Sequence, residues 1–291
     1  MTDRADGVEP GTGERTADAQ PSLNLRTDVP HSARMYDYYL GGKDNFPADR
    51  AAAEHVVKLL PTAPAGARAN RRFLGRAVRF AAQELGIRQF LDIGTGIPSA
   101  NNTHEVAQSF APDSRVVYVD NDPIVLTHAR ALLRGTQEGR TAYLDADFRE
   151  PEKILAARQA RELLDFSAPV ALLAVALLHF VPDSDEPGRV LARLASELAP
   201  GSVLIISHIT GDLLPQQDRA AGGDNVVPTY RSAGVQLVPR SHEQVAALFA
   251  GFELCEPGIV PVHEWRPDGN PEDAALPRAH AHAYGAVGIK R

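Results

Sequence analysis

Two long segments are apolar on both faces, and this feature limits the possible folds more than any other. Residues 169–180 (PVALLAVALLHF) and 202–209 (SVLIISHI) lack the alternation of polar and apolar side chains that marks a half-exposed strand. Such segments are typical of central strands in a parallel sheet, which helices cover on both faces. We therefore expect an α/β protein with a buried, mostly parallel sheet.

The rest of the chain alternates between strands and helices. Further strands are predicted at 87–94, 114–122 and 141–148, and two closing strands at 252–260 and 283–290. The closing strands have no helix between them, which predicts an antiparallel pair. Helices are predicted at 48–60, 67–86, 103–110, 122 to about 134 (with Asp122 as the N-cap), 151–163, 186–198 and 241–250. Short connections predict βαβ units in one core domain over 87–291.

Composition limits the location and the partners of the protein. The formal net charge of −7 argues against nucleic acid and anionic membranes, which both attract basic surfaces. The longest apolar run, 169–181, is too short for a membrane span. The one cysteine, Cys255, allows no intramolecular disulfide and favours the reducing cytoplasm. Residues 1–23 are acidic and have no apolar core, so we expect neither a secretion signal nor packed structure there.

A glycine turn follows the first predicted strand, in FLDIGTG at 90–96. A Gly-x-Gly turn at this point is shared by several nucleotide-binding folds, so it is weak evidence alone. The third glycine of the dinucleotide motif is missing, and Asp92 would repel a pyrophosphate. Asp92 is instead suited to ordering the loop or to meeting a cationic ligand. The sequence therefore disfavours an NAD-dependent oxidoreductase, although it leaves that alternative open.

Carboxylates also follow the second and third strands. Asp120 can accept hydrogen bonds from both hydroxyls of a ribose, because a carboxylate has two acceptor oxygens. Asp147 could accept from an adenine amino group, and Phe148 would cover the base. Because ligands of such sheets bind at the carboxyl ends of the strands, we expect Asp120 and Asp147 on one rim with residues 92–96 and with His179.

Several stretches resemble the cofactor motifs of class I S-adenosylmethionine-dependent methyltransferases: FLDIGTG, VVYVDND, DADFREP and VALLAVALLHFVPD. ARMYDYYLGGKDNFPADRAAAE, NRRFLGRAVRFAAQELGIRQFLDIGTGIP and NTHEVAQ resemble more specifically a largely actinobacterial family of S-adenosyl methyltransferases, long filed as a domain of unknown function. The resemblance implies a Rossmann-like fold with seven strands in the order 3-2-1-4-5-7-6 and an antiparallel last strand. It implies S-adenosylmethionine as cofactor, near Gly94, Thr95 and Gly96 at its amino-acid part and near Asp120 and Asn121 at its ribose.

Methyltransferases of this class commonly cover the cofactor with N-terminal helices, which predicts a helical lid over residues 24–86. Within it, Tyr36, Tyr39, Lys43 and Asn45 are predicted to face the cofactor or the substrate. Lys43 could pair with the cofactor carboxylate. A tyrosine ring could lie near the sulfonium methyl as a cation–π contact, and Tyr39 is counted as a catalytic candidate.

The acceptor side is less defined. His179 and His208 end the fourth and fifth strands and could act as general bases. We predict a small-molecule acceptor, with 211–239, and in it Tyr230 and Arg231, helping to shape its pocket. No metal site is predicted, because the histidines lack zinc spacing and thiolate ligands are absent. A protein that binds S-adenosylmethionine or S-adenosylhomocysteine without catalysis is the alternative. The sequence does not determine the oligomeric state.

Overall fold

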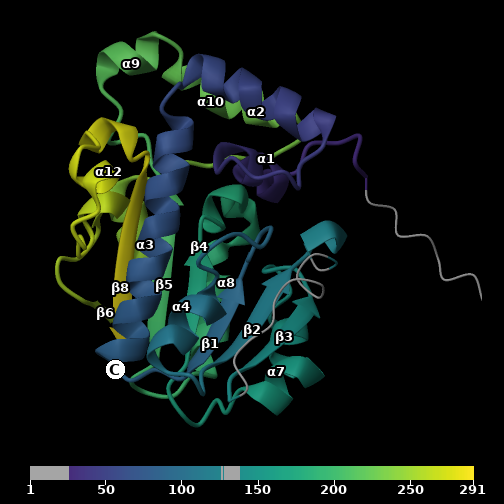
Figure 1. Cartoon of the computed structure of the whole chain (residues 1–291), viewed down its shortest axis with the longest axis vertical. Coiled ribbons are helices and arrows are strands. Elements are labelled where there is room, and N and C mark those ends of the chain that lie inside the picture. The colour runs from purple at the N-terminus through teal and green to yellow at the C-terminus, as the bar shows by residue number, and fades with distance from the viewer. Residues whose placement is uncertain (1–25, 126, 128–137) are drawn as a thin grey trace, which may run out of the picture.

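The computed structural model describes residues 26–125, 127 and 138–291, and its centre is one mixed sheet between layers of helices (Figure 1). The strand order is β3-β2-β1-β4-β5-β8-β6, and the short β7 pairs with β8. The strands are β1 (Gln89–Ile93), β2 (Arg115–Asp120), β3 (Arg140–Asp145), β4 (Ala171–Val175), β5 (Val203–Ile209), β6 (Phe252–Leu254), β7 (Val260–Pro261) and β8 (Ala283–Lys290).

The strand pairing confirms the predicted topology. β1 to β5 are parallel to one another. β8 lies between β5 and β6 and is antiparallel to both, in the 3-2-1-4-5-7-6 pattern. Three details of the strand prediction were wrong. The strand predicted over 252–260 ends at Leu254, and its last residue, Val260, begins the separate strand β7. The sheet gains β7 as an eighth strand, antiparallel to β8. The strand predicted over 169–180 ends at Val175, because Ala176 adopts a φ of +54° and a 3₁₀ turn follows at Leu178–Phe180.

The described helices lie between these strands and at the strand ends. They are α1 (Ser32–Tyr39), α2 (Pro47–Leu59), α3 (Ala63–Gln83), α4 (Thr103–Phe110), α6 (Pro151–Ala156), α7 (Arg158–Leu163), α8 (Pro187–Ser196), α9 (Gln216–Ala220), α10 (Val226–Ser232), α11 (His242–Ala247) and α12 (Pro271–Ala274). The single helix predicted at 151–163 is two, since Ala157 has an extended ψ of 134°. Most of the helix predicted from Asp122 to about 134 lies outside the described residues, but its cap is present: the Ile124 N–H donates to Asp122 Oδ1.

Each face of the sheet has its own apolar core. Leu91 and Ile93 of β1 pack on the side of α6, α7, α8 and α11, whereas Phe90 packs on the side of α3 and α4. Alternating side chains of a buried strand must point to opposite faces, so both faces need apolar residues. This is the physical reason for the two-sided apolar segments in the sequence.

The N-terminal helices divide between two locations. Figure 1 shows α1, α2 and α10 gathered at one end of the sheet, and they share an apolar cluster that includes Met35, Val56 and Tyr230. By contrast, α3 packs along the sheet face through Phe73 and Ala77. Within the described part of the predicted lid segment 24–86, α1 and α2 lie at the strand ends, whereas α3 extends from there along the sheet face. None of the described helices has the length and apolar character needed to cross a membrane.

Candidate functional site

A cavity of about 210 Å³, the first cavity, opens at the carboxyl ends of β1 to β4. The three predicted carboxylates, Asp92, Asp120 and Asp147, all line it. Its other lining residues are His31, Ser32, Ala33, Tyr36, Asn70, Arg71, Leu74, Ile93, Gly94, Thr95, Gly96, Asn121, Ala146, Phe148, Arg149, Val175, Ala176, Leu177, Phe180 and Val181. The structure therefore brings together all of the cofactor-binding residues predicted from the strand ends.

The glycine turn has a left-handed backbone with its amides already in use. Gly94 and Gly96 have φ of +71° and +67°, a region that side chains disfavour. The N–H groups of Gly94 and Thr95 donate to the Val119 carbonyl at 2.8 and 3.3 Å, and the Gly96 N–H donates to Asp120 Oδ2 at 2.8 Å. Phosphates bind at such turns through free backbone N–H groups. This turn offers none at these three positions, so it is not built as a phosphate cradle.

Asp92 is buried beneath the turn, with 5% of its surface exposed. The Thr103 hydroxyl at the start of α4 donates to its Oδ2 at 2.6 Å, which ties the first strand to the helix after the turn. Burial raises the pKa of Asp92 to about 6, because a charged carboxylate loses water there. The carboxylate is thus positioned to order the loop and is costly to ionise without a cationic neighbour.

Asp120 joins the second strand to the glycine turn. Its Oδ2 accepts from Gly96 N–H, and its Oδ1 accepts from Asp122 N–H at 2.9 Å. Burial raises the pKa of Asp120, and these two hydrogen bonds oppose the rise. Each oxygen keeps acceptor capacity toward the cavity, because a carboxylate oxygen can accept two hydrogen bonds.

Asp147 is held by a partner that the sequence analysis missed. Arg149 forms a fork onto it, with Nε and Nη2 at 2.8 and 2.7 Å from the two carboxylate oxygens. Asn121 Nδ2 also donates to Asp147 Oδ2 at 2.7 Å. Chiefly because of Arg149, the pKa of Asp147 is lowered to about 2. Asp147 is therefore a fixed anion on the cavity wall.

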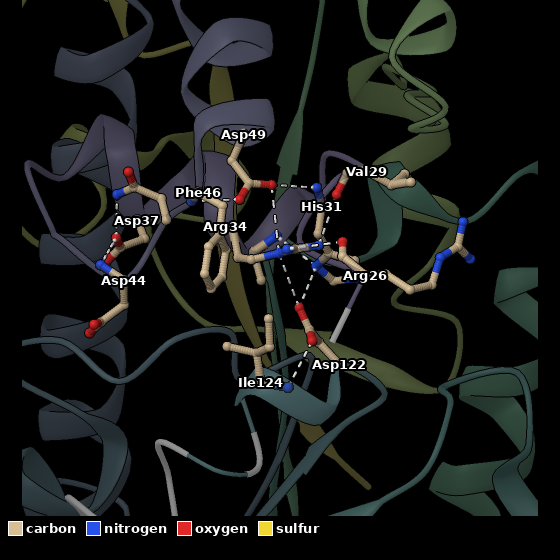
Figure 2. Close-up of polar contacts among 12 residues, drawn as sticks. Arg26, Val29, His31, Arg34, Asp37, Asp44, Phe46, Asp49, Asp122 and Ile124 are labelled. Carbon is tan, nitrogen blue, oxygen red and sulfur yellow. Dashed lines mark hydrogen bonds and ion pairs between the residues drawn. The ribbon is translucent and has the colours of Figure 1, made fainter. Parts of the chain in front are cut away.

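A charged network attaches α1 to the sheet beside the first cavity. Figure 2 shows Arg34 between Asp49 and Asp122, with its Nε 3.6 Å from a carboxylate oxygen of each. His31 Nδ1 lies 3.1 Å from Asp122 Oδ2, and the backbone N–H of His31 donates to Asp49 Oδ1. Arg34, Asp49 and Asp122 are all buried. The network holds the residues of α1 that line the cavity.

The lid residues predicted to face the cofactor divide into two groups. Tyr36 lines the first cavity, whereas Tyr39 lines only the second cavity described below. Lys43 is exposed, and Asn45 is buried with its Nδ2 on Asp37 Oδ2 at 2.7 Å. Neither Lys43 nor Asn45 lines either cavity, because the loop between α1 and α2 folds back onto the Asp37 carboxylate of α1. The geometry gives no support to their predicted contact with the cofactor.

Two polar residues of α3 on the wall of the first cavity were not predicted from the sequence. Asn70 is buried, and its Nδ2 donates to the Tyr36 hydroxyl at 2.8 Å. Arg71 donates to the Ala100 carbonyl through Nε and Nη2 and brings a positive charge to the first cavity. The signal was a polar residue on the buried face of an amphipathic helix, where apolar side chains are the norm.

A second cavity of about 100 Å³ adjoins the first and shares five wall residues with it: Ser32, Tyr36, Asn70, Ala176 and Phe180. Its remaining wall comes from α1, α2, α3, α10, β5, β8 and nearby loops: Tyr39, Val56, Leu60, Ala63, Gly66, Ala67, His179, Ser207, Ile209, Val226, Tyr230, Leu237, Ala281, His282 and Ala283. The predicted contribution of 211–239 is present through Tyr230, but Arg231 is exposed and does not line the cavity. The Tyr39 and Tyr230 hydroxyls are 3.0 Å apart.

His179 lines the second cavity as a neutral ring. Burial, with His208 and Arg240 nearby, lowers the pKa of His179 well below its ordinary value. Its Nδ1 accepts from the Ile209 N–H at 3.3 Å, so in the neutral ring Nε2 carries the proton. This geometry favours a hydrogen-bond donor over the general base that the sequence suggested.

His208 is fully engaged by its neighbours and lines neither cavity. Arg240 Nη1 lies 2.9 Å from His208 Nε2, and an arginine can only donate, so Nε2 accepts. His208 Nδ1 therefore carries the proton and donates to the Ile209 carbonyl at 2.8 Å. With both nitrogens used, His208 supports the structure, and the geometry does not place it where a base would act.

The fold and the carboxylate rim define a class I S-adenosylmethionine-dependent methyltransferase. The chain belongs to the S-adenosyl methyltransferase family, whose model matches residues 18–291. It is similar to a DUF574 family protein from Streptomyces avermitilis MA-4680, with 46% identity over 92% of this chain and 100% of that one and a TM-score of 0.87. It is also similar to a candidate methyltransferase from Thermobifida fusca YX, with 41% identity over 93% and 98% of the chains and a TM-score of 0.83. A comparison with curated proteins finds no match.

The first cavity fits the family's cofactor, S-adenosylmethionine. Its carboxylates suit a ribose, an amino group and a positively charged sulfur, and its turn lacks the free amides that a pyrophosphate requires. A Cβ atom on Gly94 would lie 2.6 Å from Leu177 Cδ1, so a larger residue here would have to displace the Leu177 side chain, which lines the same cavity. Leu74 and Phe148 add apolar surface for the flat base.

Proposed function

We propose that this methyltransferase holds its cofactor in the first cavity and methylates a small molecule bound in the second. The observation that carries the proposal is the carboxylate rim beside a glycine turn whose own amides are satisfied. When bound, S-adenosylmethionine supplies a methyl group on a positively charged sulfur, which keeps the electron pair of the bond when the methyl leaves. The chain's own residues bind and align the two reactants and exclude water, which can account for much of the rate.

Each wall residue has a role that matches its chemistry. Asp120 accepts from the ribose hydroxyls, and Phe148 covers the adenine, while both oxygens of Asp147 are occupied by Arg149 and Asn121. Arg71 takes the place proposed earlier for Lys43 and pairs with the cofactor carboxylate, because it lines the first cavity and its Nη1 has no hydrogen bond to any described residue. Asp92 favours the positively charged part of the cofactor. The Tyr36 ring, on the wall common to both cavities, lies where a cation–π contact to the methyl group is available.

A small molecule is supported as the acceptor by the second cavity and by charge. The cavity is small, and the chain carries a net charge of −7, which disfavours a polyanionic acceptor such as RNA. His179 Nε2–H can donate to an acceptor heteroatom and orient its lone pair. A cytoplasmic location agrees with a single cysteine, Cys255, that needs no oxidising compartment.

The proposal is tested by calorimetry with S-adenosylhomocysteine and with NAD. We expect S-adenosylhomocysteine to bind and NAD not to bind. Asp120→Ala should weaken S-adenosylhomocysteine binding about 100-fold, because it removes charge-assisted hydrogen bonds to the ribose and releases the Gly96 amide. Asp145→Ala, at an exposed carboxylate that also ends a strand and lines neither cavity, is the matched control and should change nothing. Tighter binding of NAD would reverse the proposal.

A further inference from the structure

We propose that the second cavity binds a single uncharged aromatic ring that carries one hydroxyl or N–H group, and that Asn70 accepts the hydrogen bond from that group. The inference rests on the proposed function, because it assigns the substrate class of the same site. It is carried by the size of the cavity, by the absence of charge on its wall and by one unsatisfied buried oxygen.

The size of the second cavity limits the acceptor to one ring. Its volume is about 100 Å³, below the roughly 150 Å³ of engineered apolar cavities that take up one benzene, so there is no room for a second ring. Three tyrosines and Phe180 line it, together with aliphatic side chains such as Val56 and Leu237. Such a wall favours a flat apolar ring, since aromatic pairs gain from edge and offset contacts.

The wall of the second cavity carries no formal charge. It contains no aspartate, glutamate, lysine or arginine, whereas the first cavity has three carboxylates and two guanidinium groups. Its histidines are neutral near pH 7: burial lowers the pKa of His282 to about 4, and that of His179 is also lowered. Burial raises the pKa of Tyr39 and raises that of Tyr230 to about 12, so both stay protonated. A charged acceptor would lose its water with nothing to replace it.

The hydrogen bonds of Tyr36 determine which way Asn70 presents its amide. The Tyr36 hydroxyl donates to the Ala67 carbonyl at 3.0 Å, because a carbonyl can only accept. The Tyr36 oxygen must then accept from Asn70, which places Nδ2 toward it at 2.8 Å. Asn70 Oδ1 is left buried without a hydrogen-bond partner among the described residues. Unsatisfied buried acceptors are rare in native proteins.

Asn70 lies on the wall common to both cavities, which is where an acceptor atom must meet the transferred methyl. A ligand O–H or N–H that donates to Asn70 Oδ1 would satisfy this oxygen. It would also bring the lone pair of the same ligand oxygen or nitrogen to the wall common to both cavities. His179 also lines the second cavity and can donate to the same heteroatom. A ring with one such group therefore matches the wall better than a plain hydrocarbon does.

The test is a panel of one-ring probes, measured by ligand-observed NMR and calorimetry with and without S-adenosylhomocysteine. Phenol should bind, benzoate and benzylamine should bind at least about tenfold more weakly because of their charge, and toluene about fivefold more weakly because it has no donor. Equal or tighter binding of benzoate or benzylamine would overturn the inference, as would the absence of phenol binding up to about 20 mM.

Variants locate the binding. Val226→Phe, at a half-buried wall position, should reduce phenol affinity about tenfold by filling the cavity and leave S-adenosylhomocysteine affinity unchanged. Val227→Phe, one residue along α10 and not on the wall, is the matched control. Asn70→Leu should remove the preference for phenol over toluene. An unaltered phenol affinity in Val226→Phe would refute the site. Phenol binding in the second cavity without any S-adenosylhomocysteine binding would refute the proposed function and leave this inference standing.

Discussion

The two adjoining cavities differ sharply in chemistry although they share a wall. The first is rich in charge, with Asp92, Asp120 and Asp147 opposite Arg71 and Arg149. The second has only neutral side chains and two paired phenols. The carboxylates of the first cavity lie at or just after strand ends, where loop amides and hydroxyls can solvate them. The second cavity is lined mostly by apolar side chains, which cannot solvate a charged group.

The difference shows how one fold can bind a charged ligand and an uncharged one side by side. The cofactor side requires polar groups at set positions, and the sheet supplies them from consecutive strand ends. The acceptor side is formed by the helices over the sheet together with β5 and β8, none of which carries the carboxylates of the rim, so its shape can change without disturbing the rim. Four experiments test whether the two sides are as separate as this comparison implies.

The largest effect is expected from Arg34→Met, which should damage both cavities together. The variant leaves the buried Asp49 and Asp122 without their shared cation, so we expect the free energy of unfolding to fall by about 3 to 5 kcal/mol. Urea denaturation measures the loss. Arg68→Met, on the exposed side of α3, is the control and should stay within about 0.5 kcal/mol of the parent. Equal losses in the two variants would contradict the role of the network.

Asp92→Asn should change how stability depends on pH. The pKa of Asp92 is about 6 in the folded protein, above its ordinary value of 3.8, so between these pH values the folded state binds more protons than the unfolded state. The contribution of Asp92 to stability therefore falls as pH rises through this window, by about 3 kcal/mol in total. Asparagine has no such dependence.

We expect the stability of Asp92→Asn relative to the parent to rise between pH 4 and pH 7, when both are unfolded in urea at several pH values. Asp145→Asn, which removes an exposed carboxylate, should show no such trend relative to the parent. A difference between Asp92→Asn and the parent that is independent of pH would show that burial does not perturb this carboxyl.

Gly94→Ala and Gly96→Ala form a matched pair within the turn. Both replace a glycine at positive φ, which costs about 1 kcal/mol. Only at Gly94 does the new Cβ meet another residue closely, since Ala33 Cβ is 3.9 Å from the one at Gly96. We expect Gly94→Ala to lose about 2 to 3 kcal/mol in thermal unfolding and Gly96→Ala about 1. Adding Leu177→Ala should restore part of the loss only at Gly94, and restoration at both would refute the clash.

The smallest effect is expected from Tyr39→Phe, which affects the second cavity alone. It leaves the buried Tyr230 hydroxyl without its partner and should lower stability by about 1 kcal/mol. S-adenosylhomocysteine affinity should not change, because Tyr39 does not line the first cavity. Tyr38→Phe, whose hydroxyl makes an exposed hydrogen bond to Glu54, is the control for both measurements. A clear loss of cofactor affinity would show that the cavities are coupled.

Local patterns in the sequence were enough to predict the sheet and the rim of the first cavity. Two-sided apolar strands imply helices on both faces, and Asp92, Asp120 and Asp147 were identified because each lies in or directly after its own strand. These relations hold within about ten residues of chain and depend on alternation and on where a strand ends. The same local reasoning predicted Asp122 as a helix N-cap.

The second cavity, and the hydrogen bonds of the side chains in and beside it, depend on contacts between segments that are distant in the sequence. His208 is engaged because Arg240, 32 residues away, reaches its ring, and Asn70 is left unsatisfied because of a bond between Tyr36 and Ala67. Lys43 looked suitable from its position in the lid, but the loop turns it to solvent. Hydrogen-bond partners and cavity walls arise from segments that meet only in the folded chain, so no local pattern encodes them.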